Sequence, residues 1–290
     1  GVDRLVEQPD EIFSLTPGQF GGTLSWLASP RPEAQHTDAL QAADAAWVLE
    51  RCARQQDRPF FLAVGFFRPH TPYVAPQSYF ELYPEHQMPV VQGVKEDQAD
   101  IPPPGLGSYK KEQDALTDDL RRQALQAYYA SISFMDAQVG KVLDALDQHG
   151  LTESTIIVFT SDHGYHTGQH GLWQKMSLFE ESARVPLIVA APGVTQPGTN
   201  PQGQSLVPRL KDVNVPGRGW ALTQVTRSTG GAGARRAQRQ SVAAGEAARP
   251  APAATGAGTA ANPAGAGPSN QYFGYTLRTA RWRYTEWDDG

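Results

Sequence analysis

Three stretches of the chain have the apolar pattern of strands buried inside a sheet. Residues 60–67, Phe-Phe-Leu-Ala-Val-Gly-Phe-Phe, form an uninterrupted apolar run of strand length, which predicts a central strand covered on both faces. Residues 155–160 are β-branched and aromatic, and residues 185–191 show a similar pattern. These two segments therefore predict a second and a third strand.

Two other segments carry apolar residues at helical spacing. Thr37 or Asp38 is the expected N-cap of a helix that runs to about Gln55. Residues 120–149 predict one long helix, and Gly150 is its expected stop. Strands and helices alternate with crossovers of this length in α/β proteins. The predicted fold class is therefore α/β, with a largely parallel sheet and helices on both faces.

Composition excludes several classes of protein. The chain has 25 Lys and Arg against 30 Asp and Glu, a net charge of −5, which argues against a nucleic-acid-binding surface over the whole molecule. Its longest apolar run falls far short of the roughly 18 to 20 residues of a membrane span. The single cysteine, Cys52, excludes an internal disulfide. Because the chain starts at Gly1, we interpret it as a processed or truncated product.

Glycine and proline are concentrated in two regions. Residues 69–104 form a Pro-rich stretch too long for a simple connector, which is typical of a functional or wrapping loop. Residues 228–269 are rich in Ala, Gly and Pro and contain no aromatic residue. Such a segment buries too little apolar area to offset its ordering entropy, so we expect a disordered insert.

Unusual residues follow two of the predicted strands, where ligands bind in open α/β sheets. The first strand leads into residues 68–73, Arg-Pro-His-Thr-Pro-Tyr, and the second into residues 161–170, Ser-Asp-His-Gly-Tyr-His-Thr-Gly-Gln-His. Asp162 and His163 offer a carboxylate and an imidazole, suited to Mg²⁺, Mn²⁺, Zn²⁺ or Ca²⁺ if other ligands join them. The alternative is that Asp162 caps a turn and the histidines are surface loop residues.

Two further side chains are candidates for anion chemistry. Lys175 follows Asp162 in a segment with too few charges for a simple solvated face, and its ammonium suits a tetrahedral oxyanion. His70 lies between Pro69 and Pro72, which restrain its backbone for a role as a leaving-group acid. A surface lysine and a structural histidine are the alternatives.

Several motifs together resemble the type I, formylglycine-dependent sulfatases of the alkaline phosphatase superfamily. They are Thr-Ser-Asp-His-Gly at 160–164, Gly-Leu-Trp-Gln-Lys-Met-Ser at 171–177 and Ala-Arg-Val-Pro-Leu-Ile at 183–188. Residues 67–73, 79–84 and 284–290 are most similar to the iduronate-2-sulfatase-like branch.

The resemblance implies roles for individual residues. Asp162 and His163 match ligands of a divalent cation, commonly Ca²⁺ with Mg²⁺ as the alternative, and Lys175 matches the lysine that contacts the sulfate. His70 matches the histidine that faces the sulfate ester as leaving-group acid, and Tyr165 is expected in the wall of the substrate pocket. The implied function is hydrolysis of the sulfate ester of a sugar or small molecule.

The sequence also departs from the family pattern. The nucleophile of these enzymes is a cysteine or serine in C/S-x-P-x-R that is oxidised to formylglycine, and no residue here matches that motif. Cys52 lies in Arg-Cys-Ala-Arg on a predicted helix, and we interpret it as a core residue. We therefore expect an N-terminally truncated chain with no nucleophile of its own, inactive as an isolated polypeptide.

The resemblance also organises the chain into domains. Residues 1–195 are expected to be the C-terminal part of a catalytic domain, 196–227 the start of a C-terminal subdomain, 228–269 the insert and 270–290 a strand segment of the subdomain. Two alternatives remain, namely a phosphatase or phosphonate hydrolase of the same superfamily, and a non-catalytic protein derived from a sulfatase. Family members are typically exported to the periplasm, the extracellular space or the lysosome. The expected partner is a sulfated carbohydrate or a small sulfate ester, with no nucleic acid.

Overall fold

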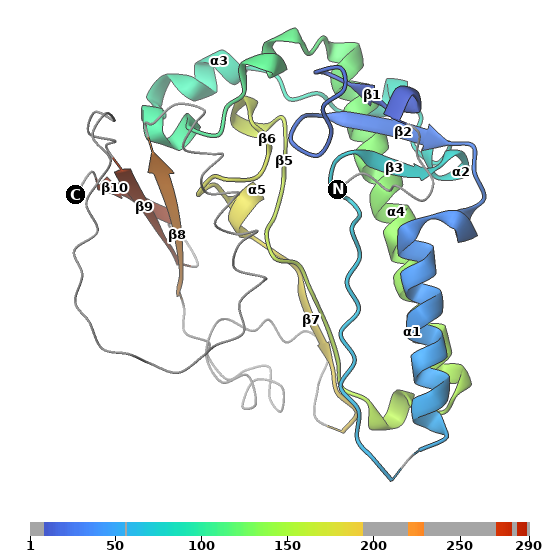
Figure 1. Ribbon diagram of the computed structural model, residues 1–290. Helices are drawn as coiled ribbons and strands as arrows, with labels where there is room; N and C mark the ends of the chain where they lie inside the picture. The colour runs from blue at the N-terminus through green and yellow to red at the C-terminus, as the bar shows by residue number, and fades with distance from the viewer. Residues whose placement is uncertain (1–8, 56, 194–219, 229–270, 280–282, 289–290) are drawn as a thin grey trace, which may run out of the picture.

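The computed structural model describes residues 9–55, 57–193, 220–228, 271–279 and 283–288 (Figure 1). Two long helices, α1 (Thr37–Ala53) and α4 (Asp118–Gln148), pack against each other and confirm the two predicted helices. The other α-helices are single turns: α2 (Gln77–Phe80), α3 (Val94–Asp97) and α5 (Glu180–Ala183). Short 3₁₀ helices lie at Pro9–Glu11, Glu33–Gln35, Glu85–Gln87, Gln98–Asp100, Pro103–Leu106, Lys111–Ala115, Thr152–Ser154 and Gln169–Gly171.

The strands form small sheets of mixed direction. β2 (Ser25–Ser29) pairs antiparallel with β1 (Phe13–Ser14) and parallel with β3 (Tyr73–Pro76). β4 (Ile157–Thr160) and β7 (Leu187–Ala190) correspond to two predicted strands and pair antiparallel. β5 (His166–Thr167) and β6 (Trp173–Gln174) form an antiparallel two-residue ladder. The α/β fold class is confirmed, and β2–β3 is the one parallel pair among the described strands.

A three-stranded antiparallel sheet lies in the C-terminal part of the chain. It consists of β8 (Trp220–Ser228), β9 (Gln271–Thr279) and β10 (Arg283–Asp288), in the order β10-β9-β8. The strands fall within or at the edges of the two segments expected to form a C-terminal subdomain, and the domain boundaries stay a prediction. The expected disordered insert, 228–269, lies outside the described residues except for its first position.

The helix caps differ at one end from the prediction. Thr117 caps α4, its Oγ1 accepting from the Leu120 N–H at 3.2 Å, and Gly150 follows the helix end with a φ of 67°. For α1, the prediction of Thr37 or Asp38 as N-cap is wrong, because the cap position is His36. The buried Asp38 carboxylate instead accepts the backbone N–H groups of residues 67 and 68 and so supplies hydrogen bonds to the backbone of that loop.

Residues 60–67 do not form the predicted central strand. No described strand pairs with this segment, and its side chains alternate between half-buried and exposed positions. Phe60 and Leu62 pack against a cluster formed by α1, α4 and Leu151, whereas the Phe61 side chain is 95% exposed. The apolar run is therefore covered on one face only by the described residues.

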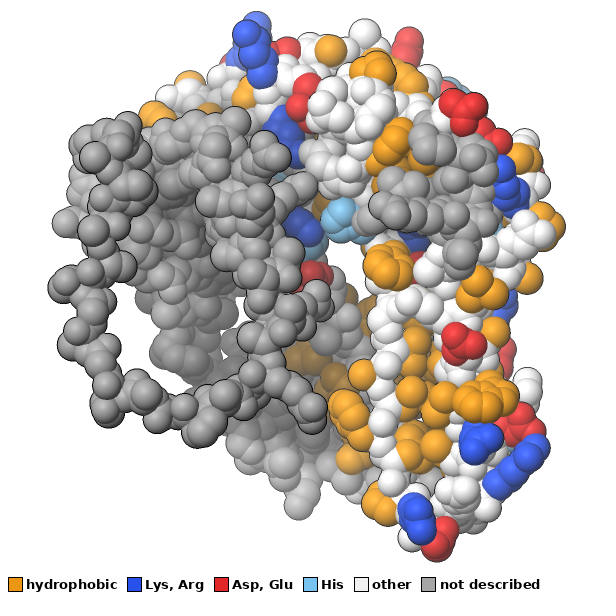
Figure 2. Space-filling view, in the orientation of Figure 1, with side chains coloured by type: hydrophobic (Ala, Val, Ile, Leu, Met, Phe, Trp, Pro, Cys, Tyr) orange, Lys and Arg blue, Asp and Glu red, His pale blue; other side chains and the backbone are white. Residues whose placement is uncertain are grey.

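Several other apolar side chains are also exposed. Figure 2 shows hydrophobic side chains gathered at the surface in the lower half of the molecule. The exposed apolar set, as it is called below, comprises Phe61, Phe67, Ile156, Val158 and Ile188.

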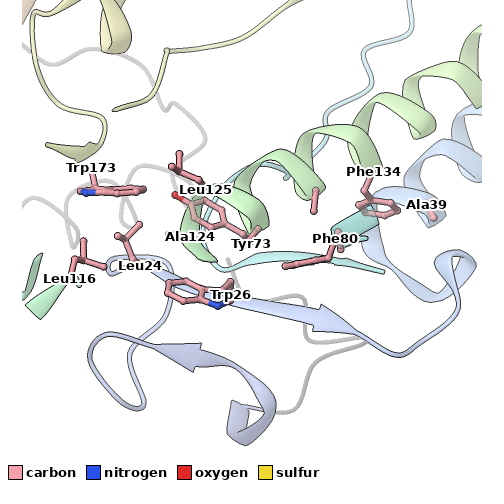
Figure 3. Close-up of a cluster of buried hydrophobic side chains, with 13 residues drawn as sticks. Leu24, Trp26, Ala39, Tyr73, Phe80, Leu116, Ala124, Leu125, Phe134 and Trp173 are labelled. Atoms are coloured by element: carbon pink, nitrogen blue, oxygen red, sulfur yellow. The ribbon is translucent and has the colours of Figure 1, made fainter. Parts of the chain in front are cut away.

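The main hydrophobic core lies between β2, β3 and the first half of α4. Tyr73 is fully buried there and Phe134 is 1% exposed, and Figure 3 shows Tyr73 beside Ala124 and Leu125. Trp173 of β6 belongs to the same cluster. The core therefore holds together β3, which continues the loop of His70, and the segment that precedes Lys175. No described helix is both long and apolar enough to pass through a bilayer.

Candidate functional site

The loop that carries His70 is fixed by buried polar contacts. Arg68 is 5% exposed, and its guanidinium donates to the backbone carbonyls of Val74 at 2.8 Å and Pro72 at 3.1 Å. The peptide bonds before Pro69 and Pro72 are both cis. The two hydrogen bonds that Arg68 donates, together with the two that the Asp38 carboxylate accepts, leave the His70 loop little freedom.

His70 itself is half-buried with one ring nitrogen engaged. Nδ1 lies 2.7 Å from the Thr71 carbonyl oxygen, which can only accept, so Nδ1 carries the proton and Nε2 is the nitrogen left for chemistry. Burial is the largest influence and lowers the pKa of His70; the Thr71 carbonyl opposes that shift, and the charges of Lys175 and His163 add to it. That His70 shares one site with Lys175 and His163 stays a prediction.

Asp162 and His163 come directly after β4, as predicted. The Asp162 carboxylate accepts the His163 backbone N–H at 3.0 Å and is otherwise largely exposed. His163 Nδ1 lies 2.8 Å from the Gly164 carbonyl oxygen, so Nδ1–H donates to it and Nε2 keeps its lone pair. Asp162 Oδ2 lies 3.4 Å from that Nε2.

Lys175 meets His163 directly. Its Nζ lies 2.7 Å from His163 Nε2, so the ammonium donates to the ring nitrogen. The residues on either side, Gln174 and Met176, have φ angles of 77° and 79°, a region that non-glycine residues rarely occupy. Such strain persists only when neighbouring contacts impose it, and it clusters at functional sites.

Gly164 allows the chain after β4 to approach α5. Its N–H donates to the Ser182 carbonyl at 2.8 Å. A Cβ at this position would lie 2.1 Å from the Glu181 carbonyl oxygen and 2.6 Å from that of Arg184. Only glycine therefore fits here, and this close contact fixes the direction in which His163 leaves the strand.

The donor pair Asp162 and His163 suits a divalent cation. The Nδ1–H bond to Gly164 holds His163 in the tautomer that ligates through Nε2, and the 3.4 Å between Nε2 and Asp162 Oδ2 is a span that two ligands of one ion can have. The Lys175 ammonium donates to the same Nε2 lone pair, so it has to leave that nitrogen when a cation binds. Among the described residues there is no group of three or more His, Cys, Asp or Glu that could complete the site. The pair therefore supplies part of a coordination shell.

Two aromatic residues near the site belong to the core. Tyr165 stacks on Tyr128 with ring centroids 5.0 Å apart, and its hydroxyl lies 2.5 Å from that of Tyr73. Burial raises the pKa of Tyr165 well above its usual value. Its expected role as a wall of the substrate pocket stays a prediction. Trp173 is 4% exposed, and Cys52 is half-buried on α1 with a free thiol.

Sequence reasoning missed two residues that organise the site. Asp38 lies about thirty positions before the backbone groups that it binds, and no local pattern indicates a contact at that separation. His166 is fully buried and its Nε2 lies 2.7 Å from Ser177 Oγ. A ladder of two residues on each strand brings His166 near Ser177, and such a ladder is too short to recognise from sequence.

Comparison with known proteins gives consistent results. The profile of the family described as Sulfatase matches residues 16–210. A sulfatase of Formosa agariphila is 39% identical over 183 residues, covering 61% of this chain and 36% of the relative. The iduronate 2-sulfatase of Mus musculus is 35% identical over 203 residues, covering 65% of this chain and 36% of the relative. The chain thus spans about a third of the length of these curated relatives.

Solved structures share the fold. The putative sulfatase yidJ of Bacteroides fragilis is 25% identical with a TM-score of 0.51, over 67% of this chain and 45% of that one. A phosphonate monoester hydrolase of Silicibacter pomeroyi is 21% identical with a TM-score of 0.65, over 90% of this chain and 53% of that one. At that identity the second likeness concerns the fold alone.

Proposed function

Because the chain belongs to the sulfatase family, we propose that it is part of a sulfuric ester hydrolase acting on the sulfate ester of a sugar or small molecule. One observation carries the proposal: the Lys175 ammonium lies 2.7 Å from His163 Nε2, within electrostatic reach of His70. In this proposal a cation and two imidazoles, which come from loops more than ninety positions apart in sequence, share one site. Such a cluster is suited to hold a tetrahedral anion.

Lys175 is the residue that neutralises the substrate in this proposal. Its ammonium donates to His163 in the absence of an anion and has two further N–H groups. Two nearby residues, Trp173 and Ser177, are both under a tenth exposed, and partial exclusion of water strengthens the attraction of the Lys175 ammonium for a sulfate oxygen. Charge that develops on sulfur-bound oxygens during cleavage is then offset by a preplaced cation.

Asp162 and His163 would hold a divalent cation, which membership of the family implies. We propose Ca²⁺, with Mg²⁺ as the alternative, since a carboxylate and further oxygen ligands suit either ion. When bound, the cation polarises the sulfate oxygens. The chain's own contribution is to present Nε2 of His163 by fixing its tautomer on the Gly164 carbonyl.

His70 is the proposed acid for the leaving group. With Nδ1–H held by the Thr71 carbonyl, Nε2 is the atom that gives a proton to the ester oxygen. Burial lowers the pKa of His70 in the free protein, so the ring is neutral at pH 7. A bound sulfate anion favours the protonated ring and raises this pKa, which couples substrate binding to protonation of the acid.

The nucleophile of the family, a formylglycine, has no matching motif in this sequence. The one cysteine, on α1, lacks the proline and arginine of that motif. Hydrolysis is therefore proposed for the enzyme of which this chain is part. The proposal extends to export from the cytoplasm, on family membership alone.

Hydrolysis assays with matched lysine variants test the proposal. The full-length enzyme that contains these residues together with a formylglycine nucleophile is assayed for sulfate release from an aryl sulfate and a sulfated monosaccharide, with calcium present, because no residue of this chain matches the nucleophile motif. Lys175→Ala is expected to lower kcat about a hundredfold or more, whereas the exposed Lys95→Ala changes it less than about twofold. Equal rates for the two variants, or sulfate release that needs neither Lys175 nor His70, would contradict the proposal.

Phosphoryl chemistry is the second candidate. A relative described as a multifunctional alkaline phosphatase superfamily protein, from Trinickia caryophylli, is 32% identical over 169 residues. The same assay decides between the two candidates with an aryl phosphate and a phosphonate monoester. Release from these esters that exceeds release from the sulfate ester would assign the site to phosphorus instead of sulfur.

A further inference from the structure

The turn that carries Lys175 needs an external restraint. Gln174 and Met176, which flank the lysine, both have φ angles in the left-handed region, a strained conformation for residues other than glycine. On its N-terminal side, Gln174 is held by the β5–β6 ladder and by Lys110, whose Nζ lies 2.7 Å from Gln174 Oε1. The restraint on the C-terminal side has to come from Met176 or the residue after it.

The Met176 side chain cannot supply that restraint, because it is 54% exposed. Ser177 can, because it is 6% exposed and engaged on three sides. Its Oγ lies 2.7 Å from His166 Nε2 and accepts the Phe179 N–H at 3.3 Å, and its own N–H donates to Ser182 Oγ at 3.4 Å. The shortest of these contacts is the one to His166.

His166 is built into the structure as a fixed partner. It is fully buried, and it pairs with Gln174 across the β5–β6 ladder. One residue thus restrains both ends of the turn, Gln174 through the backbone ladder and Ser177 through the ring. The edges of its ring meet Phe179 and His170 at centroid distances of 6.0 Å.

We propose that His166 is a positioning residue of the anion site, which holds the strained turn 174–177 and thereby sets the Lys175 ammonium against His163. It touches neither Lys175 nor the proposed sulfate, and it acts through Ser177. That the site binds a sulfate anion rests on the proposed function, whereas the restraint that His166 places on the turn does not depend on it.

A neutral imidazole is the form that suits this role. Burial, followed by the nearby His170, lowers the pKa of His166 to about 4, so the ring carries no charge at neutral pH. A neutral ring keeps one nitrogen as donor and one as acceptor, and it does not add a positive charge that would repel Lys175. Other charged groups near the ring segment are Asp97 and Glu181, both of which contact His170.

The alternative is that His166 only fills space in the core. Two substitutions separate the explanations. His166→Phe keeps a planar ring of similar size and loses the bond to Ser177, whereas His166→Gln loses the ring and places an amide group near the position of Nε2. A space-filling role favours the Phe variant, and a positioning role favours the Gln variant.

Amide hydrogen exchange is measured on the full chain for wild type, both His166 variants and Ser177→Ala. We expect His166→Phe and Ser177→Ala to speed exchange of the Ser177 and Phe179 amides about fivefold or more, the loss of one hydrogen bond, and His166→Gln to stay within about twofold of wild type. The His166→Phe/Ser177→Ala double variant is expected to exchange no faster than the single variants. The proposal would be overturned if the Ser177 and Phe179 amides of His166→Phe exchanged at the wild-type rate. It would also be overturned if these amides exchanged faster in His166→Gln than in His166→Phe.

Affinity for inorganic sulfate is measured on the same proteins by calorimetry. His166→Phe is expected to weaken binding about tenfold, and His166→Gln by less than about threefold. If wild type binds no sulfate, the proposed function fails while the exchange data still decide the role of His166. If sulfate binds equally well to all variants although the turn loosens, the positioning role is refuted and the proposed function survives.

Discussion

The buried carboxylate of Asp38 gives the sharpest test of how the His70 loop is held. Asp38 is 2% exposed, and its two oxygens accept the backbone N–H groups of Phe67 at 2.9 Å and Arg68 at 3.0 Å. Asp38→Ala removes the acceptor of both hydrogen bonds from a buried position. Hydrogen bonds to charged groups contribute about 1.5–3 kcal/mol each, so two of them set an upper range of about 3–6 kcal/mol.

We expect a loss near the lower end of that range, about 3 kcal/mol in the free energy of unfolding, because the loop relaxes in part. Asp38→Asn keeps one carbonyl oxygen as acceptor but turns its NH₂ group, a donor, toward the other backbone N–H. We therefore expect it to lower the free energy of unfolding by about 2 kcal/mol. The assay is urea denaturation followed by circular dichroism, in which the Asp38→Ala midpoint falls by about 1 M or more for slopes of 2–3 kcal/mol per molar.

The matched control is Asp44→Ala. Asp44 lies on the same helix and is exposed, and surface substitutions of this kind change stability by less than about 0.5 kcal/mol. If Asp38→Ala destabilises the protein no more than Asp44→Ala does, the carboxylate does not hold the loop and the reasoning is wrong.

Three further predictions concern surface, backbone and pH. Phe61→Ser removes a side chain that is 95% exposed, so it is expected to lower binding of the dye ANS and to change stability by less than about 0.5 kcal/mol. Unchanged dye binding would show that ANS does not bind at the exposed apolar set. Gly164→Ala is expected to destabilise the protein by about 2 kcal/mol or more in urea denaturation, because the added Cβ meets the Glu181 carbonyl. Gly140→Ala lies in α4 with open space around it and is expected to stabilise the protein by about 0.5–1 kcal/mol. The reverse order of stabilities would refute the packing argument. Burial lowers the pKa of His166 to about 4 from a usual 6.5, so the unfolded chain takes up the proton at a higher pH than the folded protein does. The free energy of unfolding is therefore expected to fall by up to about 3 kcal/mol as the pH drops from 6.5 to 4. If His166→Gln loses as much stability over this pH range as wild type does, the prediction is wrong.

Sequence patterns predicted the helices well, for a physical reason. The apolar spacing of α1 and α4 reflects contacts that each helix makes on one face, and the stop at Gly150 acts within one turn. The N-caps were not predicted: Thr117 caps α4, and the cap position of α1 is His36. The position of Asp162 and His163 was equally predictable, because it depends only on the end of one strand. The tautomer of His163 was not, since it follows from the direction of the Gly164 carbonyl.

The strand prediction for residues 60–67 failed because a strand needs neighbours as well as an apolar sequence. The side chains of this run alternate between half-buried and exposed positions, as in a strand, but no described strand pairs with it. Half of its side chains face away from α1 and α4. The same limit applies to Asp38 and His166. Their roles arise from contacts between segments brought together by the fold, and local patterns carry no record of such contacts.

The central claim is that His70, His163 and Lys175 form one anion site, and calorimetric titration of the 290-residue chain with inorganic sulfate in calcium buffer tests it most directly. The account predicts that Lys175→Ala weakens sulfate binding about tenfold or more, and that the exposed Lys95→Ala leaves the affinity within about twofold of wild type. Equal affinities for wild type, Lys175→Ala and Lys95→Ala would contradict it.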